Sequence, residues 1–294
     1  MIIVKIYGGL GNQMFQYAFG RALSLRNKTS LKLDIRALTK AGARAYALHH
    51  FSIQEDFAEP DELARFDGAY KIGRHPWIDR IAQPFRTRTD AIRLVERRFH
   101  FSPHVLAVPA EANVYALGGW QSERYFADVG ETLRQDFRFR HPPQGKNLTL
   151  AEKIRQVDAI SVHVRRGDYA HDPKYSQTHG LIGLEYYRQA ISLMRQRVAA
   201  PHFFVFSDDP EWAMHNLSVD AAVDYVTHNG IDGGHDDIRL MSQCKHHIIA
   251  NSTFSWWGAW LAHRPDQIVI GPKRWFANNP VNTADVLPAA WVRI

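Results

Sequence analysis

Cysteine is almost absent from this sequence, since Cys244 is the only one among 294 residues. A single cysteine excludes an internal disulfide and any metal cluster held by several thiolates. Stability must therefore come from a hydrophobic core, and 45% hydrophobic with 22% charged residues is the balance of an ordinary globular protein. The length favours about two domains.

Long apolar runs are also missing. No stretch approaches the roughly 18 consecutive apolar residues of a membrane-spanning helix. Residues 1–5 read directly as a strand, without the charged region and cleavage site of a signal peptide. We therefore expect a cytoplasmic protein and leave open a peripheral contact with the inner face of the membrane.

The sequence has no large excess of one charge. Its formal net charge of +6 comes from 36 basic and 30 acidic residues, which is too modest for a chain that coats nucleic acid. We predict no nucleic-acid partner, while small anionic ligands fit this balance. The densest basic region, residues 71–98, would suit an anionic membrane surface or a lipid-linked substrate, although a solvated helix face is the simpler interpretation.

Familiar motifs for zinc and covalent catalysis are lacking. The 16 histidines include no His-x-x-x-His pair with a carboxylate at the spacing of a catalytic zinc site. There is no Gly-x-Ser-x-Gly motif, and Cys244 lies inside a predicted helix. Acyl transfer through a covalent intermediate therefore has no candidate nucleophile.

What is present begins with a strand, a glycine-rich turn and a helix. Residues 2–7 read as a buried strand, and apolar residues after the turn recur at helical spacing. The N–H groups of such a turn, at the positive end of a helix, form an anion site. The candidate ligand-binding residues of this turn are Gly9, Gly11, Asn12 and Gln13.

The same turn resembles the opening of a dinucleotide-binding unit, with Gly9 and Gly11 as its first two glycines. Asp34, in a second predicted strand at 31–35, would be the ribose partner. The third glycine is missing, because Met14 stands where close helix packing normally requires Gly or Ala. A nicotinamide-dependent oxidoreductase is therefore an alternative and not the main prediction.

The second half of the chain alternates strands and helices, which predicts a parallel sheet covered on both faces. The expected strands are 158–165, 202–207, 222–227, 246–251 and 267–271, and the expected helices begin near 184, 211, 236 and 255. Residues 141–147 form the best linker, so we predict two domains, 1–145 and 146–294.

Polar clusters follow three of these strands, at residues 165–168, 207–209 and 251–257. The carboxyl ends of parallel strands meet at one edge of a sheet, where ligands bind. Within the first strand, Val162 and Val164 should face the core, while His163 lies on the opposite face.

Arg165 and Arg166 at this edge suit a diphosphate, because each guanidinium offers a fixed fork of donors, and Gly167 would let the backbone approach closely. The simpler interpretation is a surface ion pair of an arginine with Asp168. With arginines on the diphosphate, a cation at Asp208–Asp209 or Asp236–Asp237 is less necessary, and we predict no metal and no cofactor.

Hydroxyl and carboxylate groups complete this candidate site. Ser252, Thr253 and Ser255 lie where a helix begins, so they would hold a phosphate or merely cap the helix. Asp208 or Asp209 would accept the two adjacent N–H donors of a guanine while His163 contacts its ring or ribose. Alternatively, either aspartate caps the next helix.

Tryptophan-containing segments allow two interpretations. The segment 118–126 and the tryptophans Trp256, Trp257 and Trp260 would line a sugar-binding cleft or pack in a core. A non-catalytic carbohydrate-binding protein would account for these aromatic residues, but not for the paired arginines together with the glycine turn.

Taken together, these motifs resemble the bacterial alpha-1,2-fucosyltransferase family, which belongs with the inverting enzymes that use GDP-fucose. The resemblance covers nearly the whole chain and rests on residues 8–17, 120–126, 163–169, 207–209 and 251–259. It implies an α/β fold with two Rossmann-like domains facing a cleft, of the GT-B type. The first domain would be the acceptor side, and the second would hold the nucleotide without a metal.

The resemblance also implies the reaction, which is transfer of L-fucose to the 2-hydroxyl of a terminal galactose on an oligosaccharide or lipid-linked glycan. O-antigen biosynthesis is the expected context. The residues expected to bind GDP-fucose are Gly9, Gly11, Asn12, Gln13, His163, Arg165, Asp208, Asp209, Ser252, Thr253, Phe254 and Ser255.

Catalysis is assigned to Arg165, which stabilises the leaving diphosphate, and to a group that accepts the hydroxyl proton. Asp168 is the first candidate for this base, with Asp172 or a phosphate oxygen of GDP as alternatives.

Overall fold

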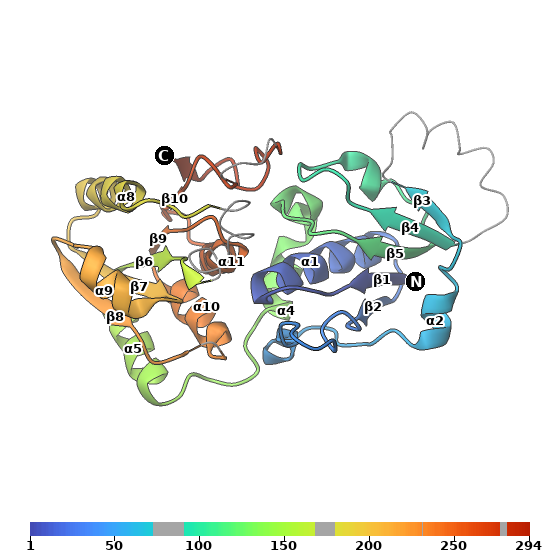
Figure 1. The fold of residues 1–294 in the computed structure, drawn as a ribbon, viewed down its shortest axis with the longest axis horizontal. Coiled ribbons are helices and arrows are strands. Elements are labelled where there is room, and N and C mark those ends of the chain that lie inside the picture. The colour runs from blue at the N-terminus through green and yellow to red at the C-terminus, as the bar shows by residue number, and fades with distance from the viewer. Residues whose placement is uncertain (73–90, 168–179, 231, 277–280) are drawn as a thin grey trace. The chain divides into compact units, whose positions relative to one another are not determined.

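The computed structural model describes residues 1–72, 91–167, 180–230, 232–276 and 281–294 (Figure 1). The chain divides into two compact units. Unit 1 consists of Met1–Arg140 and Asn282–Pro288, and unit 2 consists of His141–Val281 and Ala289–Ile294. The predicted ranges, 1–145 and 146–294, differ from these units in two places. Residues 141–145 group with unit 2, and the late segment Asn282–Pro288 groups with unit 1.

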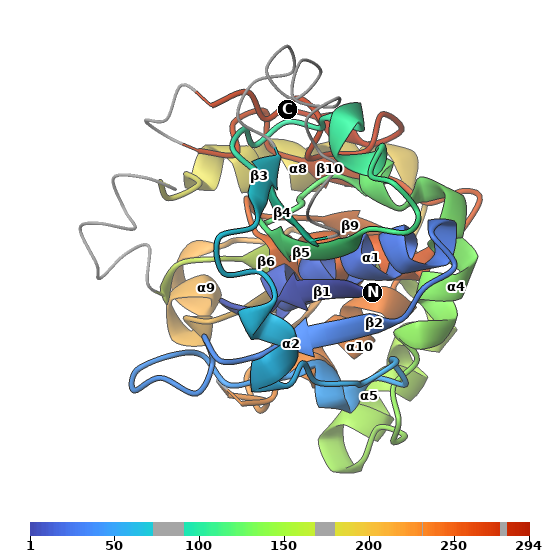
Figure 2. The same ribbon diagram turned by 90° about the vertical axis from the view of Figure 1, so that its right-hand side faces the viewer.

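Unit 1 is built on a five-stranded sheet in the order β2-β1-β5-β4-β3, with all neighbouring strands parallel. Figure 2 shows the strands in this order. The strands are β1 (Ile2–Lys5), β2 (Leu31–Asp34), β3 (Tyr70–Ile72), β4 (Ala91–Val95) and β5 (Asn113–Leu117). The α-helices are α1 (Leu10–Arg26), α2 (Pro60–Ala64) and α4 (Gly130–Asp136). Short 3-10 turns are η1 (Leu48–His50), η3 (Pro103–Leu106), η4 (Glu123–Tyr125) and η5 (Ala127–Val129).

Helix α1 packs closely on the strands β1 and β2. Ile2, Ile3 and Val4 are all fully buried, as expected for a strand of a parallel sheet that is covered on both faces. A Cβ on Gly20 would lie 2.9 Å from Leu31 Cδ1 and 3.0 Å from Val4 Cγ1. Close approach of helix and sheet therefore occurs at Gly20, six positions after Met14, which stands where a dinucleotide-binding motif would have its third glycine.

Unit 2 is built on a six-stranded sheet in the order β11-β10-β9-β6-β7-β8, again with parallel neighbours. The strands are β6 (Asp158–Val164), β7 (Pro201–Ser207), β8 (Ala222–Val226), β9 (His246–Ile248), β10 (Val269–Gly271) and β11 (Val292–Arg293). The helices are α5 (Gly145–Gln156), α8 (Leu184–Arg197), α9 (Pro210–Asn216), α10 (Gly234–Gln243) and α11 (Thr253–Ala262).

The two faces of β6 differ as its sequence predicts. Val162 and Val164 share a hydrophobic core with Tyr187 and Met194 of α8. On the other face, the ring of His163 lies 5.4 Å from the ring of Phe254 in α11. One face of the strand thus supports the core, while the other leads to the polar edge of the sheet.

The predicted α/β architecture is confirmed, with two parallel sheets. The strands β3 and β4 and the helix α5 were not predicted from the sequence, and the first residues of α5 belong to the segment predicted as linker. Cys244 directly follows the last residue of α10 and does not lie inside the helix. Within the described ranges, no helix combines the length and apolar character needed to cross a membrane.

Candidate functional site

The three polar clusters of unit 2 do converge, because β6 lies between β9 and β7 in the sheet. Their carboxyl ends place Arg165 after β6, Asp208 after β7 and Ser252 after β9 along one edge. Arg165 Nη1 lies 2.7 Å from Asp208 Oδ2, and both side chains are about three-quarters shielded from solvent. Asp208 Oδ1 also accepts the main-chain N–H of Arg166 at 2.8 Å. The ends of β6 and β7 are thus joined through one carboxylate.

Arg166 and Asp209 form a second ion pair, longer than the first. Arg166 Nε lies 3.3 Å from Asp209 Oδ2, and its guanidinium lies 3.6 Å from the centre of the Trp212 ring. Asp209 also caps α9, since its Oδ1 accepts the N–H of Trp212 at 3.2 Å. The capping interpretation of this aspartate is confirmed. Asp168, the alternative ion-pair partner and candidate base, and Asp172 lie outside the described residues.

Gly167 has a clear steric role at this edge. A Cβ at this position would lie 2.4 Å from Asp208 Oδ2, which is closer than real Cβ atoms approach. The absence of a side chain at Gly167 therefore makes room for the carboxylate that holds Arg165. The sequence-based prediction was that Gly167 lets the backbone approach a diphosphate closely.

His163 is almost fully buried, with 4% of its surface exposed. Burial lowers the pKa of its imidazole to about 4, the nearby Arg165 lowers it further, and Asp208 opposes the shift. The ring is therefore neutral at neutral pH. Its Nδ1 is buried and has no hydrogen-bond partner among the described residues. A neutral ring of this kind can accept or donate one hydrogen bond to a ligand, depending on its tautomer.

The N-terminus of α11 supplies the third polar cluster. Ser252 is the N-cap, and its hydroxyl accepts the N–H of Phe254 at 3.3 Å. The Ser255 hydroxyl is buried and donates back to the Ser252 carbonyl at 3.4 Å. Thr253 is half-buried, and the first turn of α11 has no acidic residue. Capping accounts for Ser252, while the positive end of the helix still favours an anion.

In unit 1, the glycine turn adopts the conformation that its sequence requires. Gly8 has a φ of +78°, and Gly9 is the N-cap of α1, whose first turn also lacks an acidic residue. Asn12 Oδ1 accepts a hydrogen bond from Gln121 Nε2 at 3.2 Å, which ties this turn to the segment after β5. The turn thus has the geometry of an anion site.

Gln13 has a structural role in the fold, and its predicted contact with the donor stays a prediction. Its Nε2 donates to the carbonyls of Gly8 and Ala45, each at 2.9 Å, and its Oε1 accepts the N–H of Ala47 at 3.0 Å. The fully buried amide therefore fastens the glycine turn to the segment before η1. Both N–H donors of the Gln13 amide are occupied by these carbonyls, so Gln13 fixes the position of the glycine turn.

Two polar features of the structure were not predicted from the sequence. The first is Glu96, directly after β4, whose Oε2 accepts the N–H groups of Gly119 and Trp120. Burial raises its pKa to about 7, although both hydrogen bonds lower it. Its sequence signal was the alternation of Ile92 and Leu94, which marks a strand ending just before an acidic residue.

The second missed feature is a polar network between α5 and the start of α10. Asn147 Nδ2 donates to Asn229 Oδ1 and Asp236 Oδ2, at 2.7 and 3.0 Å. Asn229 Nδ2 donates in turn to Asp237 Oδ1 at 2.7 Å. Burial raises the pKa of Asp237 to about 7, with a smaller contribution from Asp236. The pair Asp236–Asp237 was visible in the sequence, but its partners Asn147 and Asn229 lie far from it along the chain and gave no signal.

The four tryptophans considered for a sugar-binding cleft, Trp120, Trp256, Trp257 and Trp260, lie in the cores. Trp120 is fully buried and stacks on Phe19 at 3.9 Å between ring centroids. Trp256 and Trp257 are fully buried, and Trp260 is 7% exposed. The core-packing interpretation of these aromatic residues holds, which removes the main support for a non-catalytic sugar-binding module.

Asp34, the ribose partner in the oxidoreductase alternative, has side-chain partners of its own in the structure. Asp34 is 2% exposed, pairs with Arg36 at 2.9 Å and accepts the Tyr115 hydroxyl at 2.8 Å. Its carboxylate holds the end of β2 to the sheet. Within the described ranges, no three His, Cys, Asp or Glu side chains come together in a way that would hold a metal ion.

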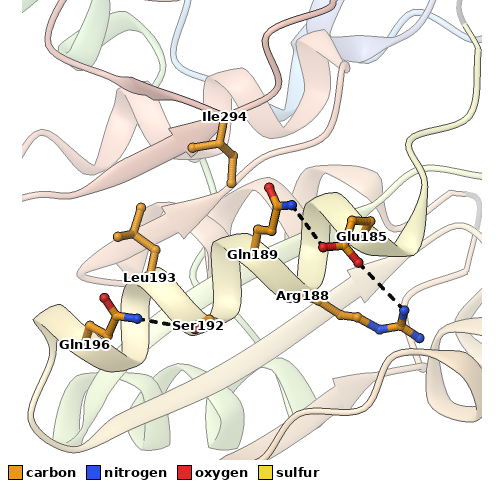
Figure 3. A pocket seen from close by; sticks show the side chains of 7 residues that line it. All are labelled: Glu185, Arg188, Gln189, Ser192, Leu193, Gln196 and Ile294. Carbon is orange, nitrogen blue, oxygen red and sulfur yellow. Dashed lines mark hydrogen bonds and ion pairs between the residues drawn. The ribbon is translucent and has the colours of Figure 1, made fainter.

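A pocket of about 480 Å³ lies along α8 (Figure 3). Its lining residues are Glu185, Arg188, Gln189, Ser192, Leu193, Gln196 and Ile294. Its polar side chains pair along the helix, with Gln189 donating to Glu185 at 2.9 Å. No strand-end residue of the polar edge contributes to it, so it is separate from the candidate site.

Comparison with known proteins decides the family. The sequence matches the family described as Glycosyl transferase family 11 over residues 1–294. The chain belongs to this family. The resemblance to the alpha-1,2-fucosyltransferases is thereby confirmed, and this family 11 member is an alpha-1,2-glycosyltransferase of the fucosyl- and colitosyltransferase group.

Two Escherichia coli relatives match this family 11 chain over nearly its full length. The alpha-1,2-colitosyltransferase is 36% identical over 307 aligned positions, which cover 100% of this chain and 99% of the relative. The O-antigen biosynthesis glycosyltransferase WbnK is 30% identical, with 98% of each chain covered. Galactoside alpha-(1,2)-fucosyltransferase 2 of Rattus norvegicus is 29% identical over about half of each chain.

Solved structures support the fold of the family 11 chain. The fucosyltransferase NodZ from Bradyrhizobium superimposes with a TM-score of 0.52 at 17% identity, covering 88% of this chain and 91% of NodZ. Arabidopsis thaliana FUT1, solved with GDP, gives a TM-score of 0.55 at 12% identity, covering 91% of this chain and 69% of FUT1. These matches agree with a glycosyltransferase fold of the GT-B type.

Proposed function

We propose that this glycosyltransferase moves L-fucose from GDP-fucose to the 2-hydroxyl of a terminal galactose, with inversion at the anomeric carbon. The observation that carries the proposal is the pair of Arg165 and Asp208, joined across the ends of β6 and β7 in a chain of family 11. The acceptor hydroxyl loses its proton to a general base, for which Asp168 stays the predicted candidate, and its oxygen bonds to the anomeric carbon. The bond from this carbon to the diphosphate breaks, and GDP leaves with the electron pair.

Arg165 is the group that we assign to the developing charge on the leaving diphosphate. A guanidinium carries five N–H donors in a planar fork, so it can keep Asp208 and bind a phosphate oxygen at the same time. Preformed donors aimed at developing negative charge usually provide the largest part of such catalysis. The start of α11, with Ser252 and Thr253, adds a helix N-terminus for a second phosphate oxygen.

The remaining donor contacts follow from the same edge. The neutral, buried His163 and the carboxylate of Asp208 are the groups that we assign to the guanine and its ribose. Contacts of the donor with Gly9, Gly11, Asn12 and Gln13 of unit 1, and the roles of Asp209, Phe254 and Ser255, stay predictions. Independence from metal ions also stays a prediction.

A second donor has specific support. The full-length relative at 36% identity is named an alpha-1,2-colitosyltransferase. Colitose differs from L-fucose by the loss of one ring hydroxyl, so one diphosphate site would serve both donors. GDP-colitose is therefore the alternative donor, transferred in the same linkage.

The test is incubation of the purified chain with GDP-fucose or GDP-colitose and a panel of β-galactosides, including a lipid-linked one, with and without a chelator. We expect one donor to be transferred in an alpha-1,2 linkage, identified by NMR of the product, at a rate that the chelator leaves unchanged. Absence of transfer from both donors would overturn the proposal, and loss of activity with the chelator would overturn its metal-free form.

A further inference from the structure

A polar network joins α5, the segment after β8 and the start of α10, all within unit 2. Strand β8 pairs with β7, so the residues that follow β8 lie at the same carboxyl edge of the sheet as Asp208, which follows β7. His228 and Asn229 belong to this segment, and α10 begins at Gly234. A ligand bound at the polar edge therefore lies at the same end of the sheet as this network.

Asn147 in α5 is the centre of the network, because its amide makes three hydrogen bonds. Its Nδ2 donates to Asn229 Oδ1 at 2.7 Å and to Asp236 Oδ2 at 3.0 Å. Its Oδ1 accepts a hydrogen bond from His228 Nε2 at 2.7 Å. Asn147 is 8% exposed, so these bonds form away from water, where hydrogen bonds are strongest. Removal of this one amide would break all three bonds.

Asn229 extends the network into the first turn of α10. Its Nδ2 donates to Asp237 Oδ1 at 2.7 Å, and its main-chain carbonyl accepts the N–H of Gly233 at 3.0 Å. A Cβ on Gly233 would lie 2.2 Å from this carbonyl oxygen, so only glycine permits the turn. Asp236 also pairs with Arg239 one turn along the helix, at 3.2 Å. Side chains and main chain together thus fix the start of α10.

Helix α10 in turn supports α11, whose first residues lie at the polar edge. A Cβ on Gly234 would lie 3.2 Å from Phe254 Cε2, so the first residue of α10 lies against the Phe254 ring. Farther along the same helix, Met241 packs closely on α11, because a Cβ on Gly258 would lie 2.8 Å from Met241 Cβ. The two helices thus touch at two points, and a displacement of the start of α10 would change the position of Phe254.

The ring of Phe254 connects this support to His163. The two ring centroids lie 5.4 Å apart, and His163 lies in β6 two positions before Arg165. Both rings come from elements whose carboxyl or amino ends form the polar edge. The direction in which the buried imidazole presents its nitrogens to a ligand therefore depends on where Phe254 lies.

We propose that Asn147 is a positioning residue of the nucleotide site: it holds the start of α10, α10 holds Phe254, and Phe254 fixes the ring of His163. This inference rests on the proposed function, which assigns His163 to the guanine and its ribose. Asn147 lies in α5 and not at a strand end of the polar edge, so it acts through other residues. Every contact in this series lies inside unit 2.

The test measures the Kd for GDP by calorimetry in Asn147→Ala, Asn147→Asp and Asn216→Ala. Alanine removes all three bonds, whereas aspartate keeps an oxygen for His228 and loses both N–H groups. We expect the Kd to rise about tenfold in both, because substitutions in such networks change the coupling to a site by roughly 2- to 30-fold. The matched control is Asn216, an exposed asparagine whose Nδ2 donates to the Trp212 carbonyl at 2.9 Å, and its variant should bind GDP as the wild type does.

A second substitution reaches Phe254 without touching the network. Gly234→Ala would place a methyl group 3.2 Å from Phe254 Cε2, so the ring must yield by a few tenths of an ångström. We expect weaker GDP binding here as well, while Gly183→Ala, whose Cβ meets no atom within 4 Å, should leave the Kd unchanged. In the double variant, Gly234→Ala should add less to the effect of Asn147→Ala than it causes alone, because both act on the same ring.

Two further readouts separate positioning from a general loss of stability. The KM for the sugar donor should rise in Asn147→Ala, while kcat and the KM for the acceptor stay unchanged. The ring-nitrogen signals of His163, observed by NMR with isotope-labelled histidine and assigned by their absence in His163→Gln, should shift in Asn147→Ala and Gly234→Ala. A circular dichroism spectrum identical to that of the wild type would show that each variant is folded.

The outcomes distinguish this inference from the proposed function. If the wild type binds no GDP, the proposed function fails first. If the wild type binds GDP and the folded Asn147→Ala binds it equally well, only the role of Asn147 is wrong. Weaker binding with unchanged His163 signals would overturn the connection through Phe254, and so would full additivity of the two substitutions.

Discussion

The carboxyl edges of the two sheets differ in the groups that surround their acidic side chains. In unit 2, Asp208 and Asp209 lie beside Arg165 and Arg166, at 2.7 and 3.3 Å. In unit 1, Glu96 lies against two main-chain N–H groups, and burial raises its pKa to about 7. One kind of sheet edge therefore carries carboxylates paired with cations, and the other carries a carboxyl group that titrates near neutral pH.

This difference has a simple physical origin. Burial of a carboxyl group away from any cation favours its protonated form, which raises the pKa of Glu96. Fixed positive charge suits the binding of a diphosphate, and a carboxyl group that titrates near pH 7 suits uptake of a proton. The four substitutions below test this contrast.

The largest effect is expected from Arg165→Ala. It removes the guanidinium that we assign to the diphosphate and leaves the mostly shielded Asp208 carboxylate without its nearest cation. We expect the transfer rate to fall about 10²–10³-fold, because removal of one preformed donor at a site of developing negative charge typically costs about 10²–10³ in rate. Steady-state kinetics with the preferred donor measures this loss.

Two further variants serve as controls for Arg165→Ala. Arg165→Lys keeps the charge but not the planar fork, and should recover only part of the rate. Arg188→Ala, on the exposed surface of α8 with Glu185 4.0 Å away, should behave as the wild type. Near-normal turnover and donor affinity in Arg165→Ala would remove Arg165 from the mechanism.

Gly167→Ala should disturb the same edge through sterics alone. The new methyl group would lie 2.4 Å from Asp208 Oδ2, so the carboxylate must move away from Arg165 and from the N–H of Arg166. Such overpacking typically costs about 1–3 kcal/mol, and we expect a loss of about 2 kcal/mol in unfolding free energy with a roughly tenfold weaker affinity for GDP. Chemical denaturation and calorimetry measure the two effects.

Gly183→Ala is the matched control for this substitution. A Cβ at Gly183 meets no atom within 4 Å, and its φ of −69° is open to any residue. Equal effects of the two alanines would mean that the close approach to Asp208 has no energetic consequence.

Much of unit 2 could be predicted from sequence, because the signals there are local. Alternation along residues 158–164 and the regular spacing of strands and helices predict a parallel sheet. A parallel sheet then brings the strand ends to one edge. The adjacency of Arg165, Asp208 and Ser252 follows from topology alone, without knowledge of any contact between side chains.

The contacts that give these residues their roles could not be predicted in this way. Glu96 meets the N–H of Gly119 across 23 positions, and Arg165 lies 43 positions from Asp208. Gln13 is occupied by Ala45 and Ala47, from a segment without periodicity. Hydrophobic patterning reports which face of an element is buried, but it does not report which distant polar atom completes a hydrogen bond.

Glu96→Gln should change how stability depends on pH. The folded-state pKa of about 7 exceeds the ordinary 4.5, so the folded protein binds this proton more tightly than the unfolded chain does. The stability contributed by Glu96 is present below about pH 4.5 and is lost as the pH rises to about 7. Glutamine removes the ionisation, so we expect the variant to exceed the wild type by about 1–2 kcal/mol at pH 8.

Comparison of the unfolding free energies at pH 4.5 and pH 8 isolates the contribution of the Glu96 ionisation. Near pH 4.5 the variant and the wild type should have nearly the same unfolding free energy, measured by urea denaturation. Asp237 in unit 2 also has a pKa raised to about 7, but it is present in both proteins, so its contribution cancels. If the difference in unfolding free energy between the variant and the wild type is the same at pH 4.5 and pH 8, then Glu96 is not protonated in the folded protein near neutral pH.

The smallest effect is expected from Asp209→Asn, which separates the two roles of this residue. Asparagine caps helices as well as aspartate does, so the bond from the N–H of Trp212 should survive while the charge facing Arg166 is lost. The ion pair is 3.3 Å long and partly exposed, and such pairs contribute about 0–1 kcal/mol. Arg166 also keeps its contact with the Trp212 ring.

Asp209→Ala is the matched variant, because it removes the cap and the ion pair together. Loss of an N-cap typically costs about 0.5–2 kcal/mol, so alanine should destabilise the protein by about 1 kcal/mol and asparagine by less than about 0.5 kcal/mol. Chemical denaturation at neutral pH resolves this difference. If asparagine is as damaging as alanine, then charge pairing at Arg166 stabilises this edge, and the contrast with Glu96 is larger than the ion-pair distance suggests.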